Sequence, residues 1–279
     1  MKVVQDSNLL AEALDGCHQQ GAVALVPTMG ALHDGHLALI RRARELADTV
    51  VVSSYVNPRQ FGAGEDFSAY PRTAEQDAAH CAAAGVDLLF VPNTLYVDGG
   101  AKVSLMVDES LSSCLCGRYR ISHFDGVATV VAILFHLVRP NVALFGMKDY
   151  QQLQIIRRMV GDLCFPVQIE AGATVREADG LAMSSRNLRL GGQGRALAPT
   201  IYRVMDALRQ QCVAGEISVA VLEQSGCEAL RAAGIDVEYL EIRDGDALQR
   251  MSVVDRASRL FVAARIDGVR LIDNLALGA

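Results

Sequence analysis

Short apolar segments alternate with helical patterns over the first two thirds of the chain, and this alternation constrains the fold most strongly. Residues 22–27 have the sequence AVALVP and residues 49–56 have the sequence TVVVSSYV, which predicts two buried strands. Between these strands, apolar residues recur at helical spacing over residues 36–47. A strand, a helix and a second strand in this order are typical of a βαβ unit with parallel strands. We therefore expect an α/β fold built on a parallel sheet.

The same alternation continues to about residue 175. Further strands are predicted over residues 87–91 and 142–145, and an extended segment over 166–175. Helices are predicted over residues 73–84, 124–138 and 151–160. The longest apolar run, residues 127–138, is shorter than the ~20 residues that span a bilayer. We expect it to form a buried helix.

The pattern changes after about residue 187. Amphipathic helices are predicted over residues 195–211 and 218–233, followed by a half-buried strand over 237–242. Two more apolar segments flank Asp267-Gly268, which is a two-residue hairpin signal. The last third is therefore predicted to be α+β with a small antiparallel sheet. We place the boundary within residues 176–187 and divide the chain into domains 1–180 and 181–279.

Charge and cysteine content exclude several classes of protein. The chain has 26 basic and 32 acidic residues, giving a formal charge of −6, so it lacks the basic surface of a general nucleic-acid binder. Its seven cysteines are irregularly spaced and form no Cys-x-x-Cys pair, so we expect reduced, mostly buried thiols. The first residues, MKVVQD, do not have the pattern of a signal peptide. We expect a cytoplasmic enzyme with no membrane or nucleic-acid partner.

The most informative motif is PTMGALHDGH at residues 27–36, directly after the first long strand. Ligands of open α/β sheets bind at the carboxyl ends of the strands, where a helix N-terminus offers free N–H groups to an anion. His33 and His36 are three residues apart, so both rings can donate hydrogen bonds to charge that develops on one bound group. Two alternatives are a zinc-binding pair, although no third ligand follows at suitable spacing, and an incidental pair at a helix start.

Three further polar segments lie at predicted strand ends or at the domain boundary. Gln60, in the segment NPRQF, could orient a substrate through its amide. Lys148, in FGMKDYQQ, is a point cation that could reach a phosphate. Residues 184–186 combine two hydroxyls and a guanidinium that could surround a polyphosphate. Each segment alone could be an ordinary loop, but their coincidence favours a phosphate-binding site.

The segment at the start of the second predicted helix, residues 73–84, has a structural explanation. Thr73 is a suitable N-cap residue, and Glu75 and Asp77 suit the positive end of the helix dipole. We therefore expect these residues to stabilise the helix start.

Together these motifs resemble those of the pantoate–β-alanine ligase (pantothenate synthetase) family. The matching segments extend over essentially the whole chain: PTMGALHDGH at 27–36, VNPRQF at 56–61, EDFSAYPRT at 65–73, HFDGV at 123–127, FGMKDYQQ at 145–152, READGLAMSSRN at 176–187 and RLIDN at 270–274. The resemblance implies an ATP-dependent ligase of pantothenate biosynthesis. (R)-pantoate and ATP would give a pantoyl adenylate and pyrophosphate, and β-alanine would then attack the acyl group to give pantothenate and AMP.

The resemblance also implies a fold, a cofactor and an assembly. The N-terminal domain would be a Rossmann-like parallel-sheet domain that binds the nucleotide, and the smaller α+β C-terminal domain would act as a lid. Mg²⁺ would accompany ATP, held mainly by phosphate oxygens and without assigned protein ligands. The protein would be a cytoplasmic homodimer.

Residue roles follow from the same resemblance. His36, His33, Lys148, Ser184, Ser185 and Arg186 would be catalytic, with His36 the residue usually assigned as the acid at the phosphates. Pantoate would be held by Gln60 and Gln152, and β-alanine would lie near Gln60. ATP would contact Met29, Gly30, Ala31, Leu32, His33, Asp34, Gly35, His36, Gly146, Met147, Lys148, Asp149, Val175, Met183, Ser184, Ser185 and Arg186.

The chain departs from the family pattern at one position of the predicted ATP site. Members commonly have glutamate where Met147 lies, which puts the efficiency of ATP use in question. Two other hypotheses stay open at this point: a nucleotidylyltransferase acting on a phosphorylated acceptor, and a nucleotide-binding protein without turnover. A tRNA-charging enzyme is disfavoured by the acidic charge.

Overall fold

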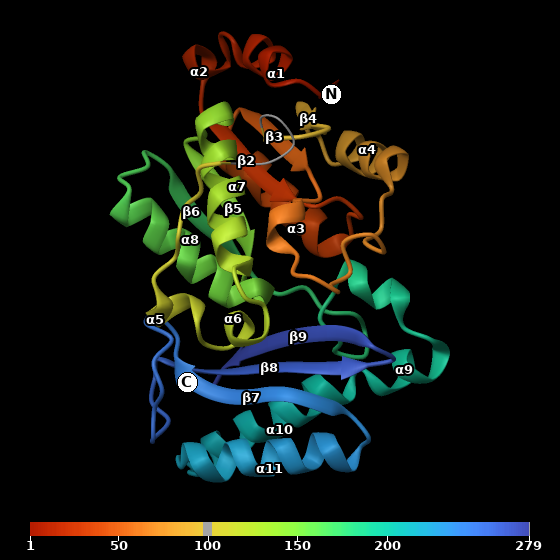
Figure 1. The fold of residues 1–279 in the computed structure, drawn as a ribbon, viewed down its shortest axis with the longest axis vertical. Coiled ribbons are helices and arrows are strands. Elements are labelled where there is room, and N and C mark those ends of the chain that lie inside the picture. The colour runs from red at the N-terminus through yellow and green to blue at the C-terminus, as the bar shows by residue number, and fades with distance from the viewer. Residues whose placement is uncertain (97–101, 279) are drawn as a thin grey trace.

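Two β-sheets organise the computed structural model, which describes residues 1–96 and 102–278. The larger sheet has six parallel strands in the order β1-β4-β3-β2-β5-β6, and the smaller is antiparallel with the order β7-β8-β9 (Figure 1). The strands are β1 (Lys2–Val4), β2 (Val23–Thr28), β3 (Thr49–Ser54), β4 (Leu88–Phe90), β5 (Val142–Gly146), β6 (Gln168–Gly172), β7 (Asp236–Asp244), β8 (Ser258–Ile266) and β9 (Val269–Ala276). The predicted α/β fold with a smaller antiparallel sheet is confirmed.

Helices connect and cover these strands (Figure 1). The α-helices are α1 (Ser7–Leu14), α2 (Cys17–Gln20), α3 (Asp34–Leu46), α4 (Ala74–Ala83), α5 (Glu109–Ser112), α6 (Cys116–Tyr119), α7 (His123–Val138), α8 (Tyr150–Asp162), α9 (Gly192–Leu197), α10 (Thr200–Val213) and α11 (Val219–Ala232). Among the described residues, short 3₁₀ helices are η1 (Pro58–Gln60), η3 (Met147–Asp149) and η4 (Ser185–Arg189).

The central strands of the six-stranded sheet, β2, β3 and β5, are buried on both faces because most of their residues are apolar. Along β2, Val23 and Leu25 join an apolar cluster that α7 and α8 complete, whereas Ala24 and Val26 join a cluster with α3 and α4. Successive side chains of a strand point to opposite faces, so a continuous apolar run feeds both clusters. This arrangement leaves the carboxyl ends of β2, β3 and β5 as the edge from which the polar loops emerge.

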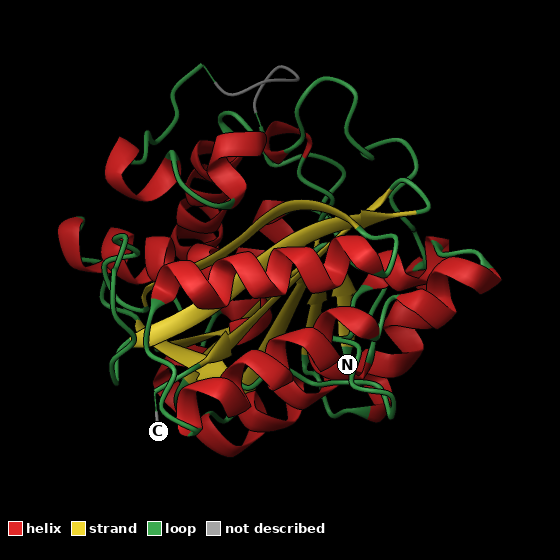
Figure 2. Cartoon of the chain, turned by 90° about the horizontal axis from the view of Figure 1, so that it is seen from below, coloured by secondary structure: helices red, strands yellow, loops and turns green. Residues whose placement is uncertain are grey.

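The three-stranded sheet packs against α10 and α11, with an apolar cluster that extends from Leu181 to Leu277. Figure 2, which views the molecule from below, shows helices in front of the strands. A separate cluster joins the two halves, since it contains Cys114 and Phe124 as well as Tyr239 and Phe261. The domain boundary that we place at residue 180 stays a prediction.

Two features of the fold differ from the sequence-based expectation. The helix predicted over residues 195–211 is divided into α9 and α10, because Pro199 lacks the N–H that a helix interior needs. The N-terminal elements β1 and α1 carried no strong periodicity, and β1 is only a three-residue edge strand. Both differences lie away from the predicted site.

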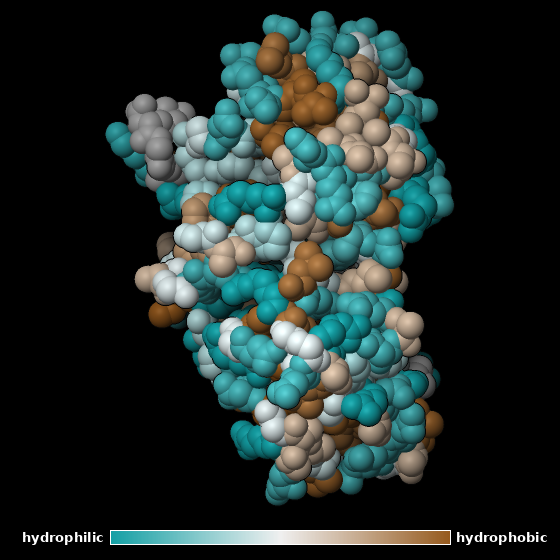
Figure 3. All heavy atoms as spheres, turned by 90° about the vertical axis from the view of Figure 1, so that its right-hand side faces the viewer, coloured by the Kyte–Doolittle hydropathy of each residue, from teal (hydrophilic) through white to brown (hydrophobic). Residues whose placement is uncertain are grey.

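The surface carries apolar residues in small groups among hydrophilic ones on the face that Figure 3 shows. The predicted apolar run forms most of α7, a buried helix of 16 residues. Within residues 1–96 and 102–278, the helices are all too short or too polar to cross a membrane.

Candidate active site

The loop after β2 takes an unusual backbone path that Asp77 of α4 fixes. Gly30 has a φ of 80° and Ala31 a φ of 51°, both in the left-handed region. The backbone N–H groups of Ala31 and Leu32 donate to the two carboxylate oxygens of Asp77, at 2.9 and 2.8 Å. Asp77 is only 2% exposed. Asp77 lies in the first turn of α4, as expected, and in addition it holds the loop of another element, which the sequence did not predict.

His33 and His36 lie against each other at the N-terminus of α3, with ring centroids 4.1 Å apart. Each Nδ1 accepts a backbone N–H, from Gly35 to His33 at 3.1 Å and from His33 to His36 at 3.3 Å. A neutral imidazole that accepts at Nδ1 carries its proton on Nε2. Both rings therefore present an Nε2–H donor away from the backbone.

Both histidines are neutral at physiological pH. Burial, followed by the charge of Lys148, lowers the pKa of His33 to about 4. Burial also lowers the pKa of His36 to about 3, with smaller effects from His33 and Lys148. These rings can thus donate hydrogen bonds without carrying a charge.

Gln60 is buried in η1, after β3, and its amide is held in one orientation. Its Oε1 accepts from Asn57 Nδ2 at 3.1 Å, and Asn57 Oδ1 accepts from the Tyr96 hydroxyl at 2.6 Å. Its Nε2 lies 3.0 Å from the sulfur of Met29. The network fixes the Gln60 amide, whose Nε2 donates one hydrogen bond to Met29 and lines the cavity with a second N–H.

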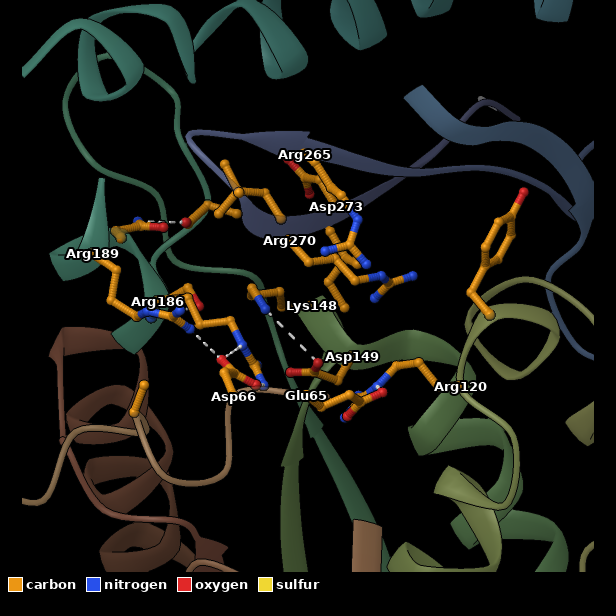
Figure 4. A pocket seen from close by; sticks show the side chains of 18 of the residues that line it. Glu65, Asp66, Arg120, Lys148, Asp149, Arg186, Arg189, Arg265, Arg270 and Asp273 are labelled. Carbon is orange, nitrogen blue, oxygen red and sulfur yellow. Dashed lines mark hydrogen bonds and ion pairs between the residues drawn. The ribbon is translucent and has the colours of Figure 1, made fainter. Parts of the chain in front are cut away.

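Lys148 lies in η3, after β5, with its side chain 17% exposed and its Nζ 3.7 Å from Asp149 (Figure 4). The neighbouring Met147 packs its side chain against the apolar cluster of α7 and α8. The residue that departs from the family pattern is therefore turned toward the core.

Residues 184–186 lie at the start of η4. Ser184 Oγ accepts the N–H of Arg186 at 3.3 Å, and Ser185 Oγ lies 3.0 Å from the Tyr70 hydroxyl. Arg186 forms two hydrogen bonds with Asp66, at 2.9 and 3.1 Å (Figure 4). Burial alone would raise the pKa of Asp66, but its arginine partners hold that pKa below the usual value. In this conformation the Arg186 guanidinium is thus occupied by a carboxylate.

Two adjoining hollows bring most of the predicted residues together. A cavity of about 200 Å³ is lined by fourteen of them: Met29, His33, Gly35, His36, Gln60, Gly146, Lys148, Asp149, Gln152, Val175, Met183, Ser184, Ser185 and Arg186. A cleft of about 720 Å³ shares Lys148, Asp149, Ser184 and Arg186 with it and continues to the arginines of β8 and β9 (Figure 4). The predicted residues that do not line the cavity are Gly30, Ala31, Leu32, Asp34 and Met147.

The family model described as pantoate-beta-alanine ligase matches residues 2–276. The chain belongs to this family. The pantothenate synthetase of Marinobacter nauticus is 44% identical over 280 residues, covering 99% of both chains. The crystal structure of pantothenate synthetase from Thermus thermophilus has a TM-score of 0.95 and 46% identity, with full coverage of both chains. The resemblance seen in the sequence is confirmed.

A more distant ligase of the family carries bound ligands. The Francisella tularensis pantoate-beta-alanine ligase, described as complexed with beta-gamma ATP and beta-alanine, has a TM-score of 0.84 and 31% identity. The aligned region covers 99% of this chain and 98% of the Francisella chain.

Several residues of the ligase site were not assigned from the sequence. His123 lines the cavity, and its Nδ1 and Nε2 lie 2.8 Å from the Gln60 carbonyl and 3.0 Å from Arg120. Burial lowers the pKa of His123 to about 3. Asn57 orients Gln60, and Tyr96 in turn holds Asn57 across 39 residues of sequence. Such long-range hydrogen bonds leave no local pattern, although His123 and Asn57 lie within segments that match the family.

Proposed function

We propose that this chain condenses (R)-pantoate with β-alanine to pantothenate, using ATP and releasing AMP and pyrophosphate through a pantoyl adenylate. Membership of the family and the ligands named for the Francisella enzyme support this proposal. The observation that carries it is one cavity that combines phosphate-directed donors, His33, His36 and Lys148, with two amides, Gln60 and Gln152.

In the first step a pantoate carboxylate oxygen attacks the α-phosphorus of ATP, and the bond to pyrophosphate breaks. Negative charge grows on the leaving pyrophosphate, and preformed donors stabilise it most when they face that charge. His33 and His36 offer Nε2–H groups and Lys148 an ammonium, while residues 184–186 supply two hydroxyls and a guanidinium. Arg186 would exchange its bond with Asp66 for one with a phosphate. His36 thus acts as a neutral donor at the phosphates.

In the second step the β-alanine amine attacks the acyl carbon and loses a proton. The carbon–nitrogen bond forms, and the carbon–oxygen bond to AMP breaks, so the bridging oxygen leaves with AMP. We assign pantoate to Gln60 and Gln152, with β-alanine beside Gln60. The Gln60 Nε2–H that does not bond Met29 suits an oxygen atom of pantoate. The ATP contacts predicted from the sequence, including the loop from Met29 to His36, remain part of this proposal.

We also propose that Mg²⁺ enters with ATP. Across residues 1–96 and 102–278, no cluster of three or more histidine, cysteine, aspartate or glutamate side chains could hold a metal ion. Magnesium at nucleotide sites is held by phosphates, water and one or two carboxylates, and Asp149 offers one carboxylate at the cavity. Asp149, half exposed at the cavity, would be its protein partner, and the ion would neutralise phosphate charge.

A cytoplasmic homodimer is the proposed assembly. All seven cysteines are free, which suits a reducing compartment. The homodimer is proposed from membership of the family. Analytical ultracentrifugation should give twice the mass of one chain.

The exchange of radiolabelled pyrophosphate into ATP tests the activity. We expect exchange that requires (R)-pantoate and needs no β-alanine. Exchange supported only by a phosphorylated acceptor would identify a nucleotidylyltransferase. ATP binding without exchange would identify a non-catalytic nucleotide-binding protein.

A further inference from the structure

Asn274, near the end of β9, reaches across to the loop that carries Lys148. Its Nδ2 donates to the carbonyl oxygen of Met147 at 2.9 Å and to that of Lys148 at 2.8 Å. Asn274 is 4% exposed, so these bonds form away from water. The two carbonyls belong to the peptide units on either side of the Lys148 Cα. One side-chain amide therefore fixes both peptide planes that set the direction of the lysine side chain.

The amide of Asn274 is itself held in place. Its Oδ1 accepts from Arg259 Nη1 at 2.5 Å, and Arg259 stacks over the Tyr150 ring, 3.9 Å from its centroid. Its backbone N–H donates to the Asp273 carboxylate at 2.7 Å. The side-chain oxygen and nitrogen of Asn274 therefore have defined and opposite partners, which removes the ambiguity of amide orientation.

We propose that Asn274 is a positioning residue for adenylation, through which the C-terminal sheet sets the place of Lys148 at the phosphates. This inference rests on the proposed function, because it concerns the charge that Lys148 would stabilise. Lysine has a flexible stem and a point charge, so its useful position depends on the backbone that carries it. Asn274 is not among the residues that line the cavity, so it would act only through this backbone.

The surroundings of Lys148 show why its position matters. Its ammonium is close enough to lower the pKa of both His33 and His36. The three donors thus form one group that faces one cavity. A displacement of about 1 Å at a reacting centre can cost about 10²-fold in rate.

A double-mutant cycle tests the proposal on the full-length protein. Asn274→Ala, Lys148→Met and the double variant are compared by pyrophosphate exchange, with kcat and the KM for ATP measured separately. We expect Asn274→Ala to lower kcat by about 10- to 100-fold. In the Lys148→Met background, the same change should cost no more than about twofold, the scatter within which independent effects add.

Gln154→Ala is the matched control. Gln154 is also a buried amide that bonds a carbonyl across the two halves, donating from α8 to Gly245 at 2.9 Å. The Gln154→Ala variant should lose a similar hydrogen bond, while its kcat changes by no more than about twofold. Equal losses in Asn274→Ala and Gln154→Ala, or additive losses in the double variant, would overturn the proposal.

Two further measurements keep the test decisive. If Asn274→Ala does not fold, Arg259→Met replaces it in the same double-mutant cycle, because it keeps Asn274 but removes the partner of its Oδ1.

NMR signals of the His33 and His36 rings give a readout that does not depend on turnover. Asn274→Ala should shift them as Lys148→Met does, with no further shift in the double variant. Unchanged signals would refute the positioning role, whereas absent exchange in the unmodified protein would refute the proposed function.

Discussion

Removal of the Asp77 carboxylate tests how the loop before the two histidines is held. Asp77→Ala leaves the buried N–H groups of Ala31 and Leu32 without their acceptor. Each buried unsatisfied donor costs about 1–3 kcal/mol, so the free energy of unfolding should fall by about 2–6 kcal/mol. Asp77→Asn keeps one acceptor oxygen and should cost about half as much. Urea denaturation followed by circular dichroism measures both values.

Glu75→Gln separates this role from the helix dipole. Glu75 lies exposed in the first turn of the same helix, so its loss removes a charge near the positive end of the dipole without freeing the loop. We expect it to cost about 0.3–1 kcal/mol. The Asp77 variants should also raise the KM for ATP, because the loop leads into His33. Equal effects of Asp77→Ala and Glu75→Gln on stability would refute the reasoning.

The remaining predictions concern the histidines and Met147. His36→Ala should slow adenylation by about 10²–10³-fold, while amide formation from preformed pantoyl adenylate suffers less; a normal rate of pyrophosphate exchange would contradict this role. Folding depresses the pKa values of His33, His36 and His123, so below the ordinary histidine pKa of about 6.5 the unfolded chain binds more protons than the folded one. The free energy of unfolding should therefore fall as the pH drops from about 6.5 to about 5.5, a range above that in which most carboxylates titrate. Urea denaturation over this range checks the slope, and a flat profile would count against it. Met147→Glu should lower the free energy of unfolding by about 1 kcal/mol, since the side chain packs against the core, and should leave the KM for ATP within about twofold; steady-state kinetics would expose a larger effect.

The parallel sheet could be predicted because its strands carry the information themselves. The run AVALVP forms β2, whose alternate side chains fill two different apolar clusters. The hairpin at Asp267-Gly268 also joins β8 to β9 as predicted. The sequence pattern did not predict β1, because a strand of three residues carries too few positions for a pattern. It also predicted one helix where Pro199 separates two.

The residues that line the candidate site could be predicted from the sequence, but most of the hydrogen bonds that position them could not. Segments at separate strand ends were expected to meet, and His33, Lys148 and Ser185 do line one cavity. The hydrogen bonds that position these residues come from distant parts of the chain. Asp77 holds the loop before His33, and Asn274 holds the backbone of Lys148. No spacing rule reports a contact across 126 residues, so only the folded chain reveals it.

Oxygen transfer from pantoate to AMP tests the central claim most directly. The unmodified protein is incubated with ATP, β-alanine and (R)-pantoate labelled with ¹⁸O in its carboxylate, and the AMP is analysed by mass spectrometry. If a pantoyl adenylate forms, one labelled oxygen per turnover should appear in the phosphate of AMP. Label in inorganic phosphate with ADP as the other product, or AMP without label, would contradict the account.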